Sequence, residues 1–175
     1  PVDNRVKKLV SELISNNDFF GNSGSQHYFG RKSKDIIENA RSEIAGLINS
    51  DPSEIIWTSG ATESINLVLK GLLLNNKSKK HIITSAIEHK ATLNCIDSIS
   101  NLLSSFSTEN KLEITYLRPD KNGVISLEKI QEAIKDNTAL ISLVHVNNEI
   151  GVVQDIDSIH LQYLKPLHFQ PQMRY

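Results

Sequence analysis

The sequence is poor in cysteine, in aromatic residues and in charge of one sign. Cys95 is the one cysteine among 175 residues, so no disulfide can form within the chain, as suits a reducing compartment. Aromatic residues make up 6% and the formal net charge is −1, so neither base stacking nor a basic field indicates nucleic-acid binding. No apolar run reaches the roughly 20 residues that a membrane-spanning helix needs. We therefore expect a cytoplasmic protein that binds neither nucleic acid nor membrane.

Signals for metal binding and for export are also missing. The six histidines form neither an HExxH motif nor a tight cluster with the cysteine, so we expect no metal site. The first residues, PVDNRVKKLV, lack an apolar stretch followed by a small-residue cleavage site. They also lack an initiator methionine, which favours a processed product or a fragment. The 39% hydrophobic and 22% charged residues are typical of a globular domain with a sizeable core.

Hydrophobic periodicity predicts helices and strands in alternation. Apolar stripes predict one helix that begins at Asp3 or Asn4 and a second that begins near Lys32. Strand-like and helix-like runs then alternate. The strand-like runs are 55–58, 81–85, 112–117 and 139–146, and the helix-like runs are 63–74, 90–103 and 127–135. Because the connections are short, this order predicts right-handed βαβ units, and hence an α/β fold with a mainly parallel sheet.

The loop after the first strand-like run has the composition of an anion site. In an open parallel sheet, ligands bind beyond the carboxyl ends of the strands. The loop reads Ser59-Gly60-Ala61-Thr62 and opens a helix. Free N–H groups at a helix start, with small residues beside them, suit a phosphate. The alternative is a capped helix behind a tight turn, and the segment contains neither GxxxxGK[ST] nor GxGxxG.

The loops after the second and fourth strand-like runs hold His89 and Asn148. A neutral imidazole at this place could stack on a flat ring or move a proton, and the alternative is a solvated histidine near a helix start. Asn148 could hydrogen-bond a ring hydroxyl or a substrate, and the alternative is a simple turn. Cys95 lies on a helical pattern beside isoleucines and is expected to be buried packing.

Four longer segments indicate one family. They read EIIWTSGATESINLVLKG, HIITSAIEHKATL, ITYLRPDKNGVISLEKIQEAI and LISLVHVNNEIGVVQDI. In this order they resemble successive blocks of the pyridoxal-phosphate-dependent cysteine desulfurases, which belong to the class V aminotransferase group. GNSGSQHYFGR also resembles a family segment, although Ser23 stands where the family usually has proline and Gly24 where it often has serine. The resemblance runs from residue 1 to residue 159, and residues 160–175 form a divergent tail.

The resemblance implies a fold and a reaction. The fold is a partial large domain of a fold-type I pyridoxal-phosphate enzyme, a three-layer α/β/α arrangement with a mainly parallel sheet. The reaction converts L-cysteine to L-alanine and passes the sulfur as a persulfide to acceptor proteins, for iron–sulfur cluster assembly. Family members are homodimers. By the same resemblance, Ala61 and Thr62 bind the cofactor phosphate, His89 stacks on its ring, and Asn148 contacts its phenolic oxygen.

Other groups that the family needs do not appear in the sequence. The lysine that holds the cofactor, the acid that pairs with its ring nitrogen and the sulfur-accepting cysteine belong to segments that follow the VQDI block in the family. Lys165 precedes a proline and lacks the family's Ser-x-His context. We therefore expect no catalytic residue in this chain and no activity from the chain alone. The alternatives are a non-catalytic remnant of a degraded gene, or a half-enzyme that pairs with another chain.

Overall fold

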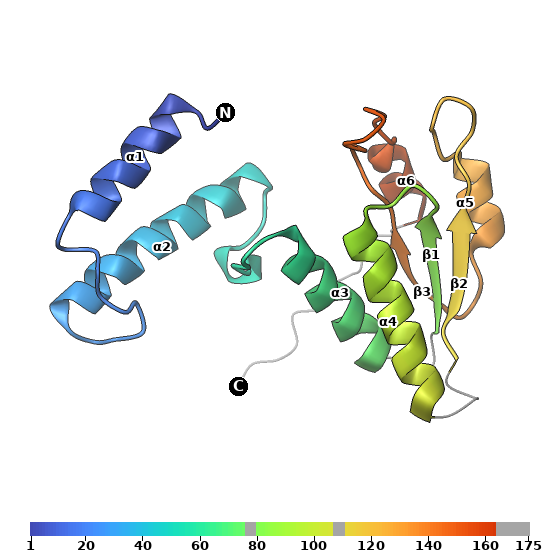
Figure 1. Ribbon diagram of the computed structural model, residues 1–175, viewed down its shortest axis with the longest axis horizontal. Coiled ribbons are helices and arrows are strands. Elements are labelled where there is room, and N and C mark those ends of the chain that lie inside the picture. Colours follow the sequence, from blue (N-terminus) through green and yellow to red (C-terminus); the bar gives the residue numbers. More distant parts are fainter. Residues whose placement is uncertain (76–79, 107–110, 164–175) are drawn as a thin grey trace. The chain divides into compact units, whose positions relative to one another are not determined.

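The computed structural model describes residues 1–75, 80–106 and 111–163, and it divides into two compact units, Pro1–Trp57 and Thr58–Tyr175 (Figure 1). The divergent tail expected at 160–175 lies mainly outside the described residues, since only 160–163 are described, as the end of the last helix.

Two helices make up most of the first unit. α1 (Asn4–Ser15) begins where the sequence predicts, because the Asp3 carboxylate accepts a hydrogen bond from a backbone N–H of the first turn. α2 (Tyr28–Leu47) begins earlier than predicted, because His27 acts as its cap and accepts a hydrogen bond from the N–H of Gly30 at 3.2 Å. A histidine is an uncommon cap, so local pattern could not reveal this start.

The prediction of a strand at residues 55–58 is wrong. The segment follows a single 3-10 turn, η1 (Pro52–Glu54), and pairs with no strand among the described residues. Its first residue, Ile55, is extended, with φ −86° and ψ 121°, and its carbonyl accepts a hydrogen bond from the Arg41 guanidinium. The β-branched pattern thus indicated an extended backbone correctly at Ile55. A strand also needs a hydrogen-bonded neighbour, which is a tertiary property.

A three-stranded parallel sheet is the centre of the second unit. It consists of β1 (His81–Ser85), β2 (Glu113–Leu117) and β3 (Thr138–Ser142), in the order β2-β1-β3. Every residue of β1 is buried, as expected of a central strand covered on both faces. β3 ends four residues before the predicted end at 146, because the chain leaves the sheet after Ser142.

Helices cover both faces of this sheet (Figure 1). α3 (Ala61–Asn75) and α4 (Lys90–Phe106) lie on one face, and α5 (Leu127–Ala133) and α6 (Ile156–Tyr163) lie on the other. α4 joins β1 to β2, and α5 joins β2 to β3. These are the expected parallel βαβ connections, so the predicted three-layer α/β arrangement is confirmed for this unit.

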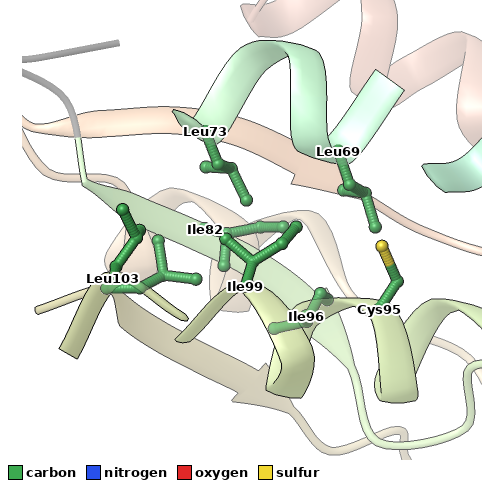
Figure 2. Close-up of a cluster of buried hydrophobic side chains, with 8 residues drawn as sticks. Leu69, Leu73, Ile82, Cys95, Ile96, Ile99 and Leu103 are labelled. Atoms are coloured by element: carbon green, nitrogen blue, oxygen red, sulfur yellow. The ribbon is translucent and has the colours of Figure 1, made fainter. Parts of the chain in front are cut away.

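Each face of the sheet has its own core. Ile82 faces α3 and α4, and the next residue, Ile83, faces α5 and α6 on the other side of the sheet. Side chains alternate in this way along any strand. Figure 2 shows Cys95 packed among isoleucine and leucine side chains, and its 4% exposure confirms the buried position expected from sequence. The first cluster contains Leu69, Leu73, Ile82, Cys95, Ile96, Ile99, Leu103 and Leu112, and the second contains Ile83, Leu117, Ile125, Ile130 and Ile159.

Candidate functional site

The amino end of α3 lies toward the carboxyl edge of the sheet. Near the other end of α3, the carbonyl of Leu73 accepts a hydrogen bond of 3.1 Å from the side chain of Lys80, directly before β1. α4 starts at the carboxyl end of β1 and packs along α3, where the thiol of Cys95 lies 3.4 Å from the amide oxygen of Asn66. The two helices therefore run in the same direction, and both begin at the edge where β1 and β3 end (Figure 1).

The start of α3 offers hydrogen-bond donors that no described residue uses. The first helical bond runs from the N–H of Ser64 to the carbonyl of Gly60. Among the described residues, none accepts a hydrogen bond from the backbone N–H groups of Ala61, Thr62 and Glu63. Apart from the two chain neighbours of Gly60, no atom of the described residues lies within 4 Å of the position where a Cβ on Gly60 would stand. Free donors, open space and the positive end of the helix dipole together suit an anion.

The one carboxylate in this first turn is directed toward the preceding loop. Glu63 accepts hydrogen bonds of 2.6 Å from both the backbone N–H and the hydroxyl of Ser59. The side-chain bond from Ser59, followed by the backbone bond, lowers the pKa of Glu63. The carboxylate therefore stabilises the entry to the helix and does not occupy the free N–H groups that follow it.

His89 caps α4. Its Nδ1 accepts a hydrogen bond of 3.1 Å from the N–H of Ala91, and its carbonyl accepts bonds from Thr92 and Leu93. Since Nδ1 accepts a hydrogen bond, the hydrogen of the neutral imidazole belongs on Nε2. The side chain is exposed, so the ring is held by the helix start and is open to a ligand.

Asn148 lies in a tight turn after β3 that its neighbour organises. The side-chain oxygen of Asn147 accepts hydrogen bonds from the N–H groups of Glu149 at 2.9 Å and Ile150 at 3.1 Å. Asn148 is exposed, and its side-chain amide has no partner within the part of the chain that the structure describes. The turn therefore presents Asn148 at its surface, while Asn147, only 6% exposed, points inward.

Two side chains fasten the loops that carry His89 and Asn148. Oε1 of Glu88 accepts a hydrogen bond from the N–H of Val144, and Asn147 donates one to the carbonyl of Ile87. Sequence pattern indicated neither contribution. Each partner lies 56 or 60 residues away along the chain, and no local pattern signals such a pairing.

The four predicted site residues all belong to the unit Thr58–Tyr175. His89 and Asn148 are on loops that are hydrogen-bonded to each other, and Ala61 and Thr62 begin the helix that packs along α4. The segment GNSGSQHYFGR belongs to the other unit. A cavity of about 540 Å³ also lies in that other unit, lined mainly by apolar residues of α1, α2 and the loop between them, and its lining includes none of the four predicted site residues.

Two further properties bear on the class of protein. In residues 1–75, 80–106 and 111–163, no three His, Cys, Asp or Glu side chains come close enough together to hold a metal ion. Over the same described residues, no helix has the length and apolar character required to cross a membrane.

A parallel sheet between two helix layers, with helix starts and polar loops at its carboxyl edge, defines an α/β protein of the kind that binds ligands at that edge. Comparison with known proteins makes the class specific. Residues 4–165 match the family model described as aminotransferase class-V. The chain belongs to the aminotransferase class-V family.

Similar proteins agree with this assignment. Cysteine desulfurase IscS of Ectopseudomonas mendocina (strain ymp) and that of Azotobacter vinelandii are each 46% identical over 161 residues, which is 91% of this chain. The crystal structure of DndA from Streptomyces lividans has a TM-score of 0.78 at 39% identity, and a NifS-like protein has 0.79 at 33%. These structures confirm the predicted fold-type I arrangement.

The match covers a minor part of the similar proteins. The chain spans 38% of the length of both IscS relatives, 43% of the DndA chain and 42% of the NifS-like chain. The shared part contains the loops described above, so the comparison bears on those loops and leaves the remainder of the relatives without a counterpart in this chain.

Proposed function

We propose that this chain carries the phosphate-binding and ring-binding part of a pyridoxal 5′-phosphate site in a cysteine desulfurase. The observation that carries the proposal is the set of backbone N–H groups at the start of α3 that no described residue uses, at the same edge of the sheet as the mutually bonded loops of His89 and Asn148. The names of the similar proteins support the same interpretation, since the curated relatives are cysteine desulfurases. The donor set fits a phosphorylated flat ring.

Each side chain has a distinct role in this proposal. Ala61 and Thr62 bind the phosphate through their N–H groups and the Thr62 hydroxyl. His89, fixed by its bond to Ala91, stacks on the ring and can pass a proton through Nε2. Asn148 hydrogen-bonds the phenolic oxygen. When bound, the cofactor supplies an electron sink for charge that develops on the substrate carbon.

The overall reaction proposed is that of the relatives. L-Cysteine is converted to L-alanine, and its sulfur passes as a persulfide to an acceptor protein for iron–sulfur cluster assembly, in the cytoplasm and in a homodimer. Cys95 does not supply the persulfide, because it is buried against Asn66 and burial raises the pKa of its thiol. We therefore propose that this chain binds cofactor but does not release alanine from cysteine by itself.

The test is calorimetric titration with 4′-deoxypyridoxine 5′-phosphate, which lacks the aldehyde that would react with surface lysines. Thr62→Val removes the hydroxyl and keeps the shape, whereas Thr62→Ser keeps the hydroxyl. His89→Asn removes the ring and keeps a good helix cap. We expect Thr62→Val and His89→Asn each to weaken binding about tenfold or more, and Thr62→Ser to bind within about threefold of the parent chain.

Two results would contradict the proposal. The first is that the analogue binds no more tightly than its dephosphorylated form, which would show that the chain has no phosphate site. The other is unchanged affinity in both Thr62→Val and His89→Asn, which would place the ligand elsewhere on the chain. Release of alanine from cysteine by the purified chain would contradict the expected inactivity without affecting the binding site.

A further inference from the structure

Glu88 is a half-buried carboxylate at the junction of two loops. Its Oε1 accepts a hydrogen bond of 2.8 Å from the hydroxyl of Ser85, at the end of β1, and one of 2.6 Å from the N–H of Val144, just after β3. Burial raises the pKa of Glu88, and the bonds from Val144 and Ser85 oppose that rise. A carboxylate that is costly to bury is thus kept here by one contact at the end of β1 and one just after β3.

Asn147 makes the reverse connection. It donates a hydrogen bond of 2.8 Å to the carbonyl of Ile87, in the loop after β1, while its oxygen holds the turn after β3. Its own N–H bonds the carbonyl of Val152, and its own carbonyl accepts from Gly151. Every polar group of this buried residue therefore has a partner, and one of these partners lies in the opposite loop.

We propose that Glu88 and Asn147 form a reciprocal clamp whose task is to position His89 and Asn148. Each clamp residue directly precedes one of those two site residues, and each bonds the loop that carries the other. Displacement of either loop therefore moves both. The clamp rests on the proposed function for its ligand, because His89 and Asn148 are there proposed to hold the ring. Glu88 and Asn147 are positioning residues and do not touch the ligand.

A positioning role predicts a selective loss of affinity for a ligand that contains the ring. A general loosening of the fold would weaken all ligands alike. The ring depends on two loops held in register, whereas the phosphate depends on the start of α3, which the clamp does not touch. Removing the clamp should therefore weaken a ligand that has both ring and phosphate and spare one that is phosphate alone. Gln at position 88 keeps an oxygen that can accept the bonds from Ser85 and Val144, so it should restore binding.

The experiment compares Glu88→Ala, Glu88→Gln and Asn147→Asp with the parent chain. Asn147→Asp keeps the oxygen that holds the turn and removes the donor to Ile87. Glu132→Ala, which truncates an exposed carboxylate on α5, is the matched control. Affinities for 4′-deoxypyridoxine 5′-phosphate and for inorganic phosphate are measured by calorimetry. Amide hydrogen exchange of residues 86–91 and 143–151 is measured without ligand.

We expect Glu88→Ala and Asn147→Asp to weaken binding of the ring ligand about tenfold, with phosphate affinity unchanged within about twofold. Glu88→Gln and Glu132→Ala should bind as the parent does. Exchange should rise in both loops in each of the two weakened variants. The reciprocal effect is the decisive readout, since a purely local role would raise exchange only in the loop that carries the substitution.

Equal loss of ring ligand and of phosphate would overturn the clamp in favour of general loosening, and so would exchange that rises in one loop only. Unchanged ring affinity in Glu88→Ala would overturn it as well. If the parent chain binds phosphate but not the ring ligand, the proposed function fails. The coupling of the two loops is then decided by hydrogen exchange alone.

Discussion

The two units differ in how much of their apolar surface they bury themselves. In Pro1–Trp57, α1 has no fully buried residue, and most of its predicted apolar stripe is exposed, with Leu9 at 56% and Ile14 at 80%. In Thr58–Tyr175, two clusters cover both faces of a sheet. An apolar stripe on a helix therefore predicts which face of the helix is favourable to bury. It does not predict which surface packs against that face. The candidate site lies in the second unit, where the sheet and its two core clusters support the loops that carry the site residues.

The largest effect should come from removing a core side chain in the second unit. Ile82 is fully buried between the sheet, α3 and α4 (Figure 2), so Ile82→Ala should lower the free energy of unfolding by about 3–4 kcal/mol. Leu9→Ala is the matched change on the exposed stripe of α1, and we expect less than about 0.5 kcal/mol from it. Urea unfolding followed by circular dichroism measures both.

A large loss of stability from Leu9→Ala would contradict the comparison, because it would show that the stripe of α1 is buried in solution. Segment-resolved hydrogen exchange shows which unit opens. In Ile82→Ala, the faster exchange should appear in α3, α4 and β1.

The second largest effect should occur in the first unit, at Gly30. A Cβ there would lie 2.4 Å from the carbonyl oxygen of Ser25 and 2.7 Å from that of Asn22, and neither backbone atom can move aside cheaply. Gly30→Ala should destabilise the start of α2 by about 2–3 kcal/mol. Gly46 lies in the same helix, and outside that helix no atom of the described residues comes within 4 Å of where its Cβ would stand, so Gly46→Ala should instead stabilise it by about 0.5–1 kcal/mol.

Fluorescence of Trp57, the one tryptophan of the sequence, reports on the first unit during unfolding. If Gly30→Ala proved as harmless as Gly46→Ala, the close packing of the loop against the start of α2 would be wrong.

The sequence predicted the elements that depend on local pattern. β1 lies at the predicted residues 81–85, and the helices α3, α4 and α5 lie within a few residues of their predicted ends. The failure at 55–58 has a tertiary cause, because an extended segment becomes a strand only beside a partner. The division into two units also depends on which surfaces meet, and periodicity carries no information about that.

The residues of the candidate site were proposed from the sequence and stay a prediction, whereas the hydrogen bonds that hold their loops could not be proposed from it. The free N–H groups at Ala61 and Thr62 could be proposed from local sequence, since every helix start leaves its first N–H groups without an intrahelical partner and small residues leave room for a ligand. The bonds that join the loops after β1 and β3 could not be read, since Glu88 and Asn147 find their partners across the sheet. Glu88 is adjacent to a predicted site residue, and that adjacency was the one available signal.

Acidification should loosen the second unit through His81, which is fully buried in β1. Its Nδ1 lies 2.8 Å from the hydroxyl of Thr138 and its Nε2 lies 2.9 Å from that of Thr115. Burial lowers the pKa of His81, while the charge of Glu113 opposes that shift and the charge of Lys135 adds to it.

Because the folded pKa lies below the unfolded value of about 6.5, the unfolded chain binds the proton first as the pH falls. The contribution of His81 is therefore complete above about pH 6.5 and is lost below it, with a slope of up to about 1.4 kcal/mol per pH unit. Urea unfolding between pH 7 and 5 should show this slope in the parent chain and a smaller one in His81→Gln. An NMR titration of the His81 ring in the parent chain is independent of how well the variant folds, and a normal or raised pKa would contradict the prediction.

The smallest effect distinguishes the units through their helix caps. Asp3 caps α1 and Ser126 caps α5, and loss of either cap removes about 1 kcal/mol of helix stability. α5 carries the fully buried Ile130 into the core of its unit, so Ser126→Ala should lower the global free energy of unfolding by that amount. α1 has no buried side chain, so Asp3→Ala should raise hydrogen exchange in the first turn of α1 and leave global unfolding unchanged. Equal global effects of the two substitutions would mean that α1 unfolds together with a core, and the difference drawn between the units would then be lost.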